Sequence, residues 1–495
     1  MSEGNEVEEV LEEDIFSQRL KKINDLTEEG IKPFGERFDN SERVESIRAR
    51  YIEDQEEPQT AIVAGRLTAF RIMGKSIFAD VKDSSGKIQI YANNKLLGDS
   101  FANYKGLNTG DIVGIEGELF ITRKGELTIR ANSYKLLSKS MRTLPEKFHG
   151  LTDVQQRYRQ RYLDLITNDD SKKVFKQRIQ IIREIRNYLE KDGYLEVETP
   201  MLQPLSGGAA ATPFETHYNA LSCSMFMRIA PELYLKRLLV GGFEKVFELN
   251  RNFRNEGMSR KHNPEFTMIE IYQAYGDCQT MMDLVEDMVT TVAQKVFGTL
   301  IIKHSDEKTI DLTRPWKRAN YKDLIKEKAG DDFFDISIDE QVKVVQGLGL
   351  HADNKMSEVE LANEIHEKII EPGLIQPTFV TRLPEQLVPL AKKCDDDQTL
   401  VDVFELEING QEIAPGYSEL NDPIEQRKRF MEQVERGDEG VDKDGTIDED
   451  FLTAMEHGMP PAGGMGIGID RLVMMLTGAE SIRDVVLFPQ MKLKN

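Results

Sequence analysis

The chain has 495 residues, of which 39% are hydrophobic and 30% are charged, and its formal net charge is −22. These values are typical of a folded enzyme with about two to four domains, and they exclude a disordered chain. The acidic balance argues against a protein that grips nucleic acid over its whole surface, although it allows local basic contact surfaces.

Membrane and export signals are not expected in this sequence. No run of 18 apolar residues is present, and the first residues are acidic, whereas a signal peptide starts basic and continues apolar. The cysteines Cys223, Cys278 and Cys394 form neither a CxxC pair nor a zinc-ligand spacing. We therefore expect a protein of the reducing cytoplasm without a membrane partner.

The first part of the chain predicts an acidic helical extension over residues 1–55, followed by a small barrel. Five short strand-like runs occur between Thr60 and Leu137, with one non-alternating segment after the third. This order is typical of an OB-fold β-barrel, which we place at residues 56–142. Residues 143–165 are then a linker with a basic balance. Its arginines at alternate positions are Arg157, Arg159 and Arg161.

Alternation along the second and third runs places aromatic and polar side chains outside the barrel. On the second run, Phe78 and Asp80 are expected to point outward, and on the third run Gln89 and Tyr91 do so. An exposed ring on an OB barrel is the usual platform for an unpaired base. With Arg71 on the same barrel, the pattern predicts RNA binding; an incidental exposed ring is the alternative.

The remaining residues, 166–495, predict a second domain of helices and strands. Apolar residues at helical spacing favour a helix over 175–189, and a short strand then ends at Pro200. The glycine-rich segment 206–214 allows a ligand to approach the backbone closely. Between about 318 and 377 the chain becomes helical and charged, which is typical of an insertion.

A charged patch is predicted where two strands flank a loop of glycine, charge and proline. The strands are Lys245–Glu256 and Phe266–Tyr275. Arg254 and Glu256 share one face of the first strand, and Glu270 and Tyr272 share one face of the second. If the strands pair antiparallel with these faces aligned, the charges need partners, because burying them alone is costly. A solvated face with incidental ion pairs is the alternative.

A second acidic patch is predicted within Val401–Ile413. Asn409-Gly410 is the strongest short signal for a two-residue hairpin turn, and such a turn pairs Glu407 with Glu412. Glu405 then lies on the same face, and three close carboxylates repel one another or raise their pKa values unless a cation lies among them. Mg²⁺ is the usual cation in a nucleotide site, so we predict a magnesium site; solvated glutamates are the alternative.

Three segments, in this order, resemble motifs 1, 2 and 3 of the class II aminoacyl-tRNA synthetases. They are the strand that ends at Pro200, the sequences FRNEG and KHNPEF at 253–257 and 261–266, and GIGIDR at 466–471. With the OB-like domain, the arrangement is similar to the aspartate, asparagine and lysine subgroup, and most similar to the bacterial lysine enzymes. The resemblance covers about residues 66–489.

The resemblance implies an α+β protein. An N-terminal OB-fold β-barrel is followed by a class II antiparallel-sheet catalytic domain with helices, and two copies pair as a homodimer around Pro200. The implied reaction joins L-lysine to ATP as lysyl-adenylate, releases pyrophosphate and transfers the lysyl group to the 3′ end of tRNA(Lys). Mg²⁺ is the implied cofactor.

The resemblance also implies the site residues. Arg254 and Arg471 are the expected catalytic residues, because positioning and charge stabilisation suffice for this reaction. Arg254 can hold a carboxylate and a phosphate together, and Phe266 can stack on adenine opposite Arg471. The implied ATP-binding residues are Arg254, Glu256, His262, Asn263, Phe266 and Arg471. The implied lysine-binding residues are Gly208, Glu232, Arg254, Glu270, Tyr272 and Glu419.

The resemblance further implies which residues bind the metal and which read the anticodon. Glu405 and Glu412 match the magnesium ligands of the family, whereas Glu407 matches none. The anticodon-reading positions are Arg71, Phe78, Gln89 and Glu126. The chain departs from the family at Pro415, where an Asn is common, because proline cannot supply that side-chain hydrogen bond.

Two other functions are alternatives to tRNA charging. One is an adenylate-forming lysine ligase that modifies a protein, and the other is an RNA-binding protein without catalysis. Relatives of the first kind typically lack the OB domain, which this chain is expected to have. The presence of Arg254, Glu412 and Arg471 argues against the second.

Overall fold

The computed structural model describes residues 2–53, 55–145, 151–304, 308–437 and 447–492. The chain folds as two compact units, residues 1–152 and 153–495. Each unit has its own hydrophobic core. Among the described residues, no helix is long and apolar enough to cross a membrane. Cys223, Cys278 and Cys394 are free thiols.

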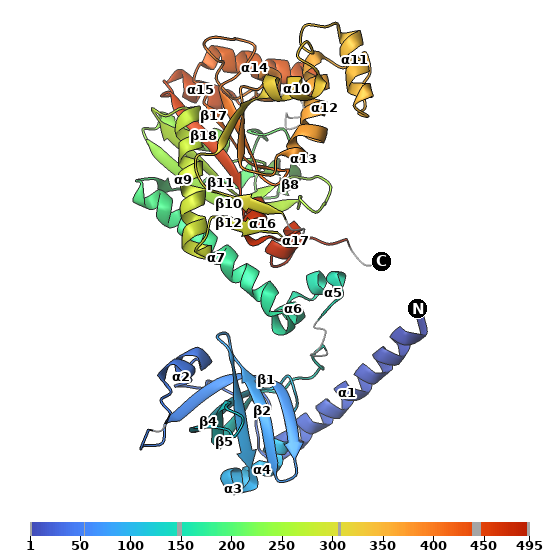
Figure 1. Ribbon diagram of the computed structural model, residues 1–495, viewed down its shortest axis with the longest axis vertical. Helices are drawn as coiled ribbons and strands as arrows, with labels where there is room; N and C mark the ends of the chain where they lie inside the picture. Colours follow the sequence, from blue (N-terminus) through green and yellow to red (C-terminus); the bar gives the residue numbers. More distant parts are fainter. Residues whose placement is uncertain (1, 54, 146–150, 305–307, 438–446, 493–495) are drawn as a thin grey trace. The chain divides into compact units, whose positions relative to one another are not determined.

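The first unit contains a closed barrel with the strand order β1-β2-β3-β5-β4 (Figure 1). Its strands are β1 (Thr60–Met73), β2 (Ser76–Lys82), β3 (Lys87–Asn93), β4 (Ile112–Ile121) and β5 (Leu127–Ser138). Three short helical segments follow the third strand: α3 (Asn94–Leu97), the 3₁₀ turn η1 (Gly98–Ser100) and α4 (Phe101–Lys105). The predicted OB-type barrel is therefore confirmed.

Two helices precede the barrel, α1 (Ser2–Glu28) and α2 (Val44–Arg50). Arg19 of α1 is 7% exposed, and its guanidinium donates to the carbonyl oxygens of Ser140 at 2.9 Å and Arg142 at 2.7 Å. On α2, Val44 and Ile47 belong to the barrel core. Both helices are thus packed on the barrel, and Arg19 serves this packing.

The second unit is built on an eight-stranded sheet with the order β14-β15-β16-β17-β18-β11-β10-β6. Its strands are β6 (Leu195–Glu196), β10 (Lys245–Phe253), β11 (Glu265–Ala274), β14 (Lys317–Asn320), β15 (Thr378–Thr381), β16 (Val403–Glu407), β17 (Glu412–Ser418) and β18 (Ala462–Gly468). All neighbours pair antiparallel except the two edge pairs, β14 with β15 and β10 with β6, which are parallel. The predicted antiparallel sheet is confirmed.

Helices and small sheets surround this large sheet (Figure 1). Apolar residues of α7 and α9 share one core with the central strands and with α16. The helices are α7 (Asp169–Lys191), α8 (Glu232–Val240), α9 (Cys278–Phe297), α14 (Pro423–Arg436), α15 (Glu449–Glu456), α16 (Ile469–Thr477) and α17 (Ile482–Val485). The small sheets contain β7 (Leu202–Gln203), β8 (Phe214–Tyr218), β9 (Cys223–Met227), β12 (Ile301–Lys303) and β13 (Thr309–Asp311).

The charged segment before β15 is helical. It contains α10 (Tyr321–Ala329), α11 (Ile338–Gly347), α12 (Glu358–Ile365), a π-helical turn (His366–Ile370) and α13 (Glu371–Gly373); a 3₁₀ turn (Glu385–Leu387) follows β15. These helices have a core of their own around Phe333, Val345 and Leu361. Their last turns carry Glu367 and Glu371 toward the carboxylates of the β16–β17 hairpin, so the segment is not remote from the site.

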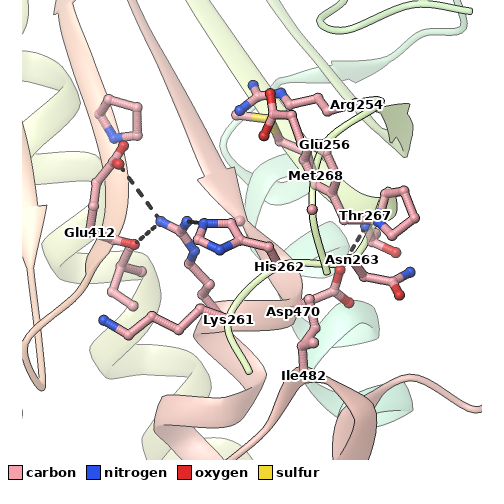
Figure 2. Close-up of a pocket in the computed structure, with 17 residues that line it drawn as sticks. Arg254, Glu256, Lys261, His262, Asn263, Thr267, Met268, Glu412, Asp470 and Ile482 are labelled. Carbon is pink, nitrogen blue, oxygen red and sulfur yellow. Dashed lines mark hydrogen bonds and ion pairs between the residues drawn. The ribbon is translucent and has the colours of Figure 1, made fainter. Parts of the chain in front are cut away.

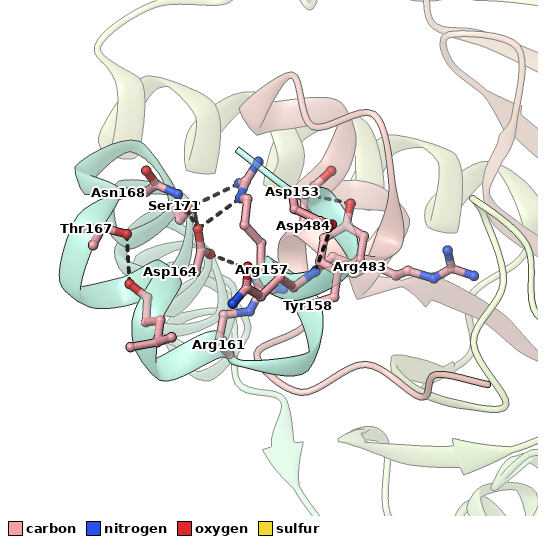
Figure 3. A network of polar contacts seen from close by, with 12 residues as sticks. Asp153, Arg157, Tyr158, Arg161, Asp164, Thr167, Asn168, Ser171, Arg483 and Asp484 are labelled. Atoms are coloured by element: carbon pink, nitrogen blue, oxygen red, sulfur yellow. Dashed lines mark hydrogen bonds and ion pairs between the residues drawn. The ribbon is translucent and has the colours of Figure 1, made fainter. Parts of the chain in front are cut away.

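The arginines of the predicted basic linker are engaged inside the second unit, on α5 (Val154–Arg159) and α6 (Arg161–Thr167) (Figure 3). Arg161 is 1% exposed, pairs with Asp164 at 2.7 Å and donates to the carbonyl oxygen of Leu487 at 2.9 Å. Arg157 also pairs with Asp164, at 2.9 Å. Arg161 therefore holds the start of this unit against its C-terminal segment, Arg157 is held by Asp164 and Ser171, and neither offers a free basic surface.

Candidate functional site

The strands β10 and β11 form the floor of the site. They pair antiparallel with Glu248 opposite Glu270 and Val246 opposite Tyr272, so the even-numbered side chains of both strands share one face. This is the alignment that the sequence predicts. Glu248 forms an ion pair with Arg228, in which Nη1 of Arg228 donates to Oε1 of Glu248 at 2.6 Å. Neither member of this buried pair was predicted, and the pair leaves Glu270 as the unmatched carboxylate of that face.

The first strand is shorter than predicted. It ends at Phe253, and the backbone N–H of Arg254 extends the pairing by one residue when it donates to the carbonyl oxygen of Pro264 at 2.9 Å. Glu256 lies beyond this pairing and is exposed. The strand prediction therefore correctly orients Arg254, whereas loop geometry places Glu256.

A cavity of about 190 Å³ opens above this end of the sheet (Figure 2). The loop between β10 and β11, the strand β17 and the start of α16 form its walls. All six residues predicted to bind ATP line it: Arg254, Glu256, His262, Asn263, Phe266 and Arg471. Glu412 and Pro415 line it as well. We call this cavity the nucleotide cavity, because the residues predicted to bind ATP line it. In Figure 2, Arg254 and Glu412 extend from opposite sides of it, with His262 between them.

Arg254 places its guanidinium group at the wall of the cavity. Its Nε is buried and has no hydrogen-bond partner among the described residues, and its Cζ lies 5.2 Å from the ring centroid of Phe266. Burial lowers the pKa of Arg254, while the carboxylates of Glu256 and Glu412 oppose that shift. A guanidinium stays charged at any physiological pH, so the cavity contains a preformed site for an anion.

Arg471 is held in place by two contacts across the cavity. Its Nη1 donates to the carbonyl oxygen of Glu412 at 2.9 Å, and its Nη2 lies 2.9 Å from Nε2 of His262. Since arginine can only donate, Nε2 must accept, and Nδ1 then carries the proton toward Oγ of Ser259 at 2.8 Å. Burial and the positive charge of Arg471 lower the pKa of His262, which favours this neutral imidazole.

The start of α16 is anchored by Asp470. One oxygen of this carboxylate accepts from the backbone N–H of Thr267 at 2.8 Å, and the other lies 2.6 Å from Nη1 of Arg178. The contacts join motif-like segments that are far apart in the sequence, and they orient the neighbouring Arg471. Asn263 is 9% exposed, and its amide donates to the carbonyl oxygen of Glu265 at 2.5 Å.

A second group of charges lies on the same face of the sheet, farther along β11, and we call it the acidic cluster. Its members are Glu232, Lys236, Glu270, Tyr272, Tyr417 and Glu419. Nζ of Lys236 lies 2.7 Å from Oε1 of Glu232 and 2.5 Å from Oε2 of Glu419. The hydroxyl of Tyr272 donates to Glu270 at 3.0 Å, and that of Tyr417 donates to Glu232 at 2.8 Å.

Burial dominates the electrostatics of the acidic cluster. It raises the pKa of Glu270 to about 8, with Glu232 adding to the shift, and it also raises the pKa of Glu419, although the ammonium group of Lys236 at 2.5 Å opposes that shift. Burial alone would lower the pKa of Lys236, but Glu232 and Glu419 outweigh it and raise that pKa. The cluster therefore has more buried carboxylate than its own cation can neutralise.

Two glycines make room for these groups. Gly208 adopts φ +87°, and a Cβ there would lie 3.3 Å from Cβ of Glu232. A Cβ on Gly464 would lie 2.0 Å from Oε1 of Glu419 and 2.6 Å from the ring of Tyr272. Gly464 belongs to strand β18, and only a residue without a side chain lets this strand approach the cluster so closely.

A second cavity, of about 210 Å³, adjoins the acidic cluster. Gly208, Glu232 and Tyr417 line it, and residues of α14 form its far wall. The deeper lysine-binding candidates Glu270, Tyr272 and Glu419 are 4%, 3% and 1% exposed. The structure thus brings all the predicted lysine-binding residues except Arg254 into one cluster, and Arg254 faces the nucleotide cavity.

Sequence reasoning missed Lys236, Tyr417 and Gly464. A signal for Lys236 was present, because it lies four residues after Glu232 and shares a helical stripe with Leu235 and Leu239. A lysine within an apolar stripe needs a buried partner. No comparable local signal marked Gly464, since its role depends on contacts with distant strands.

The β16–β17 hairpin forms as predicted, with Asn409 and Gly410 at φ +57° and +67° and Glu407 opposite Glu412. A bulge between Leu406 and Glu407 shifts the register, and it places Glu405 opposite Pro415. Burial and neighbouring carboxylates raise the pKa of Glu405 to about 8 and that of Glu407 to about 9.

The carboxylates of this hairpin do not form a complete metal cage. Among the residues that the structure describes, no three His, Cys, Asp or Glu side chains are grouped to hold a metal ion. The repulsion among these buried carboxylates nevertheless fits a site whose remaining ligands come with a substrate.

On the barrel, the predicted orientation of the second strand is confirmed in part. Ile77 and Val81 are 0% exposed, and Phe78 lies on the outer surface, where its ring centroid is 5.1 Å from that of Tyr91. Asp80 shares this face but is 6% exposed, which was not predicted.

The remaining anticodon candidates lie around Phe78. Arg71 lies 3.7 Å from Asp80, and Oε1 of Gln89 accepts from the hydroxyl of Thr128 at 3.1 Å. Glu126 pairs with Arg48 at 3.1 Å. Asp80 is covered because Arg71 and Lys87 both reach over it.

Two family models match the chain. The model described as tRNA synthetases class II (D, K and N) matches residues 153–492, and the model described as OB-fold nucleic acid binding domain matches residues 61–137. The first match spans the sheet, the nucleotide cavity and the acidic cluster. The second spans the barrel strands.

Curated relatives resemble the chain over nearly its whole length. The lysine–tRNA ligase of Pelotomaculum thermopropionicum is 51% identical over 97% of this chain and 95% of its own length. That of Syntrophomonas wolfei is 52% identical over 96% of each chain. That of Staphylococcus haemolyticus is 50% identical over 97% of this chain and 99% of its own length.

Proposed function

The chain belongs to the class II tRNA synthetases for aspartate, lysine and asparagine, and we propose that it works as a lysine–tRNA ligase through the two sites described above. It is an ATP-dependent ligase, as its lysine–tRNA ligase relatives and its class II domain require. The observation that carries the choice of residues is the acidic cluster, where buried carboxylates outnumber the one buried ammonium.

In the first step, lysine and ATP form lysyl-adenylate. A carboxylate oxygen of lysine attacks the α-phosphorus, the bond from that phosphorus to the β-phosphate oxygen breaks, and pyrophosphate leaves. Arg254 binds the attacking carboxylate and the α-phosphate, because its buried Nε has no hydrogen-bond partner among the described residues. Arg471, held by Glu412 and His262, stabilises charge on the opposite side of the nucleotide. No general base is needed, since a carboxylate is already ionised at neutral pH.

Adenine binding is assigned to the rest of the nucleotide cavity. Phe266 supplies a flat apolar surface for the base, and Glu256 contributes a carboxylate at the exposed rim. His262 and Asn263 lie near the phosphates. The neutral His262 can donate from Nδ1 after it exchanges Ser259 for the ligand.

Lysine specificity is assigned to the acidic cluster. Gly208 and Glu232 bind the α-ammonium group at the edge of the second cavity. Glu270, Tyr272 and Glu419 bind the ε-ammonium group. Oε1 of Glu419 is buried and lacks a hydrogen-bond partner among the described residues, as expected for an atom that waits for an ammonium group.

Magnesium is assigned to Glu405 and Glu412. Lysine–tRNA ligases of this family use Mg²⁺ with ATP, and bound Mg²⁺ would neutralise phosphate charge there. The buried carboxylates of the hairpin fit this ion, because a cation relieves the repulsion that raises the pKa of Glu405. Glu407 is 1% exposed and has an oxygen without a hydrogen-bond partner among the described residues, and we assign it a supporting role behind the ligands.

The barrel is assigned to the anticodon of tRNA(Lys). Phe78 offers the stacking surface, and Arg71, Gln89 and Glu126 supply polar groups around it. In the second step of the reaction, the 3′-terminal hydroxyl of the tRNA attacks the lysyl carbonyl carbon and AMP leaves.

A homodimer and a cytoplasmic location complete the proposal. Leu195 and Leu202, near Pro200, are 54% and 49% exposed, and a second copy of the chain would cover them. The free thiols of Cys223, Cys278 and Cys394 fit a reducing compartment.

The proposal is tested by ATP–pyrophosphate exchange with each of the twenty amino acids, followed by charging of tRNA(Lys). We expect exchange with lysine only and transfer of lysine to this tRNA. Exchange that depends on another amino acid would reject the lysine assignment. Exchange without transfer to tRNA would favour the ligase that modifies a protein.

A further inference from the structure

Lys236 occupies an unusual position for a lysine. It lies on the buried side of helix α8, in a stripe with Glu232, Leu235 and Leu239, and its side chain is 0% exposed. A buried ammonium group is costly unless carboxylates compensate it. The chain therefore places a positive charge in the pocket that is meant to recognise a positive charge.

The contacts of Lys236 connect two parts of the pocket. Its Nζ lies 2.7 Å from Oε1 of Glu232, on its own helix, and 2.5 Å from Oε2 of Glu419, which follows strand β17. The same Nζ is 5.7 Å from the ring centroid of Tyr417, whose hydroxyl donates to Glu232. One side chain thus holds the carboxylate assigned to the α-ammonium group and a carboxylate assigned to the ε-ammonium group.

Among the other charged groups around the cluster, Arg254 also interacts with Glu270, but it is assigned to the carboxylate group of the substrate. Glu270 and Tyr272 face the cluster from β11, and they bond to each other at 3.0 Å. Arg228 and Glu248 also influence Glu270, but they neutralise each other at 2.6 Å. The charge that a ligand meets is therefore set by the carboxylates of the cluster and by Lys236.

We propose that Lys236 is a specificity-determining positioning residue, a built-in ammonium that adjusts the pocket to the two ammonium groups of lysine. Glu232, Glu270 and Glu419 carry three negative charges when ionised, and Lys236 neutralises one of them. The two charges that remain equal the two positive charges of the substrate. A neutral amino acid leaves a buried carboxylate unpaired, so it is rejected. This inference rests on the proposed function.

Removal of the built-in charge changes how lysine binding depends on pH. Oε2 of Glu419 lies 2.5 Å from the ammonium group of Lys236, and this contact keeps the carboxylate ionised. Without Lys236, the buried Glu419 takes up a proton at neutral pH. In the variant Lys236→Met, lysine must displace that proton in addition to the proton of Glu270. The methionine fills nearly the same space as the lysine, so this variant separates the charge from the packing.

The test is the KM for lysine in pyrophosphate exchange by the full chain, between about pH 6 and 8, where the carboxylates change charge. In the wild type, we expect this KM to fall up to about tenfold per pH unit, one factor of ten for the one displaced proton. In Lys236→Met, we expect up to about 100-fold per unit, with an unchanged KM for ATP. A purely structural role would lower thermal stability but leave the pH slope equal to that of the wild type, and equal slopes would overturn the inference.

A matched control and a rescue complete the design. Lys295→Met also removes an ammonium group from a lysine–glutamate pair, but at the surface, where Lys295 lies 3.1 Å from Glu184. It should keep the wild-type slope. Lys236→Ala leaves room for n-propylammonium, which should restore lysine-dependent exchange, whereas n-propanol of similar size should not. Equal rescue by both compounds, or none by either, would contradict a role for the charge, and this variant decides the matter if Lys236→Met does not fold.

Failure of the inference and failure of the proposed function give different results. If the wild-type chain shows no lysine-dependent exchange, the proposed function is wrong. If the wild type exchanges with lysine and Lys236→Met keeps its slope, only the role of Lys236 is wrong.

Discussion

The nucleotide cavity and the acidic cluster adjoin the same sheet, but they differ in their charge and in their exposure to solvent. In the cavity, Arg254 has a buried Nε without a partner, and Glu256 is exposed. In the cluster, Lys236 and Tyr417 already contact the carboxylates, and every member is buried or forms part of the wall of a small cavity. The cavity is open, and Nε of Arg254 in it has no hydrogen-bond partner among the described residues, whereas the cluster is closed and its charged groups are largely paired.

The difference fits the ligands that we propose for the two sites. A nucleotide supplies several negative charges and its own metal, so the cavity can present cations that stay partly hydrated until the ligand arrives. Lysine supplies only two ammonium groups, and it must be told apart from amino acids of similar size. Discrimination by buried charge is strong because an unmatched buried carboxylate is expensive, and it requires a dry and rigid pocket.

The largest effect on activity is expected at the β16–β17 hairpin, where substitutions of the paired residues Glu407 and Glu412 should reduce pyrophosphate exchange to different extents. Glu412→Gln should reduce pyrophosphate exchange by about 10³-fold or more. The substitution removes a carboxylate ligand from the Mg²⁺ ion that neutralises the phosphates. Glu407→Gln, on the same hairpin face, should be mild. Exchange rates at saturating Mg²⁺ measure both, and an equal loss in the two variants would refute the assignment of Glu412 as the ligand.

Within the acidic cluster, Glu270→Gln should weaken lysine use by about 2–4 kcal/mol in kcat/KM, because it leaves an ammonium group underpaired. The KM for ATP should stay the same, since Glu270 does not line the nucleotide cavity. Steady-state exchange with varied lysine and varied ATP gives both values. Near-normal lysine kinetics would show that this cluster does not bind the substrate side chain.

The barrel allows the catalytic unit to be tested separately. Phe78→Ala should reduce tRNA charging by about 1–3 kcal/mol in kcat/KM, the usual loss of one stacking partner, while lysine-dependent exchange stays unchanged. The substitution should reduce the charging of a tRNA with an altered anticodon by a smaller factor. If exchange falls together with charging, Phe78 serves folding and does not read the anticodon.

The smallest effect is the pH dependence of the wild type. Burial raises the pKa of Glu270 to about 8, so in the free enzyme this carboxyl is protonated below that pH. Lysine needs the carboxylate, so binding releases a proton. The KM for lysine should therefore fall by up to about tenfold per unit as the pH rises toward 8 and then level off. In Glu270→Gln the part of this slope due to Glu270 should vanish, and an unchanged slope would assign the titration to another group.

Local patterns in the sequence determined much of this protein. Alternation with a period of two predicted the barrel strands and the shared face of Glu270 and Tyr272, because side-chain direction along a strand needs no distant contact. The Asn409-Gly410 turn fixed the pairing of Glu407 with Glu412 for the same reason. Motif order then identified the family and the six residues that line the nucleotide cavity.

Only the tertiary structure decided which charges meet. Lys236 contacts Glu419 although 183 positions (419 − 236) separate them in the sequence, and Gly464 is required because Glu419 and Tyr272 press against it. Arg161 looked like part of a basic linker until its buried partner Asp164 and the C-terminal segment were in place. Periodicity reports whether a side chain faces inward, but the identity of its neighbour depends on how distant segments pack, and for buried charges that neighbour determines both pKa and function.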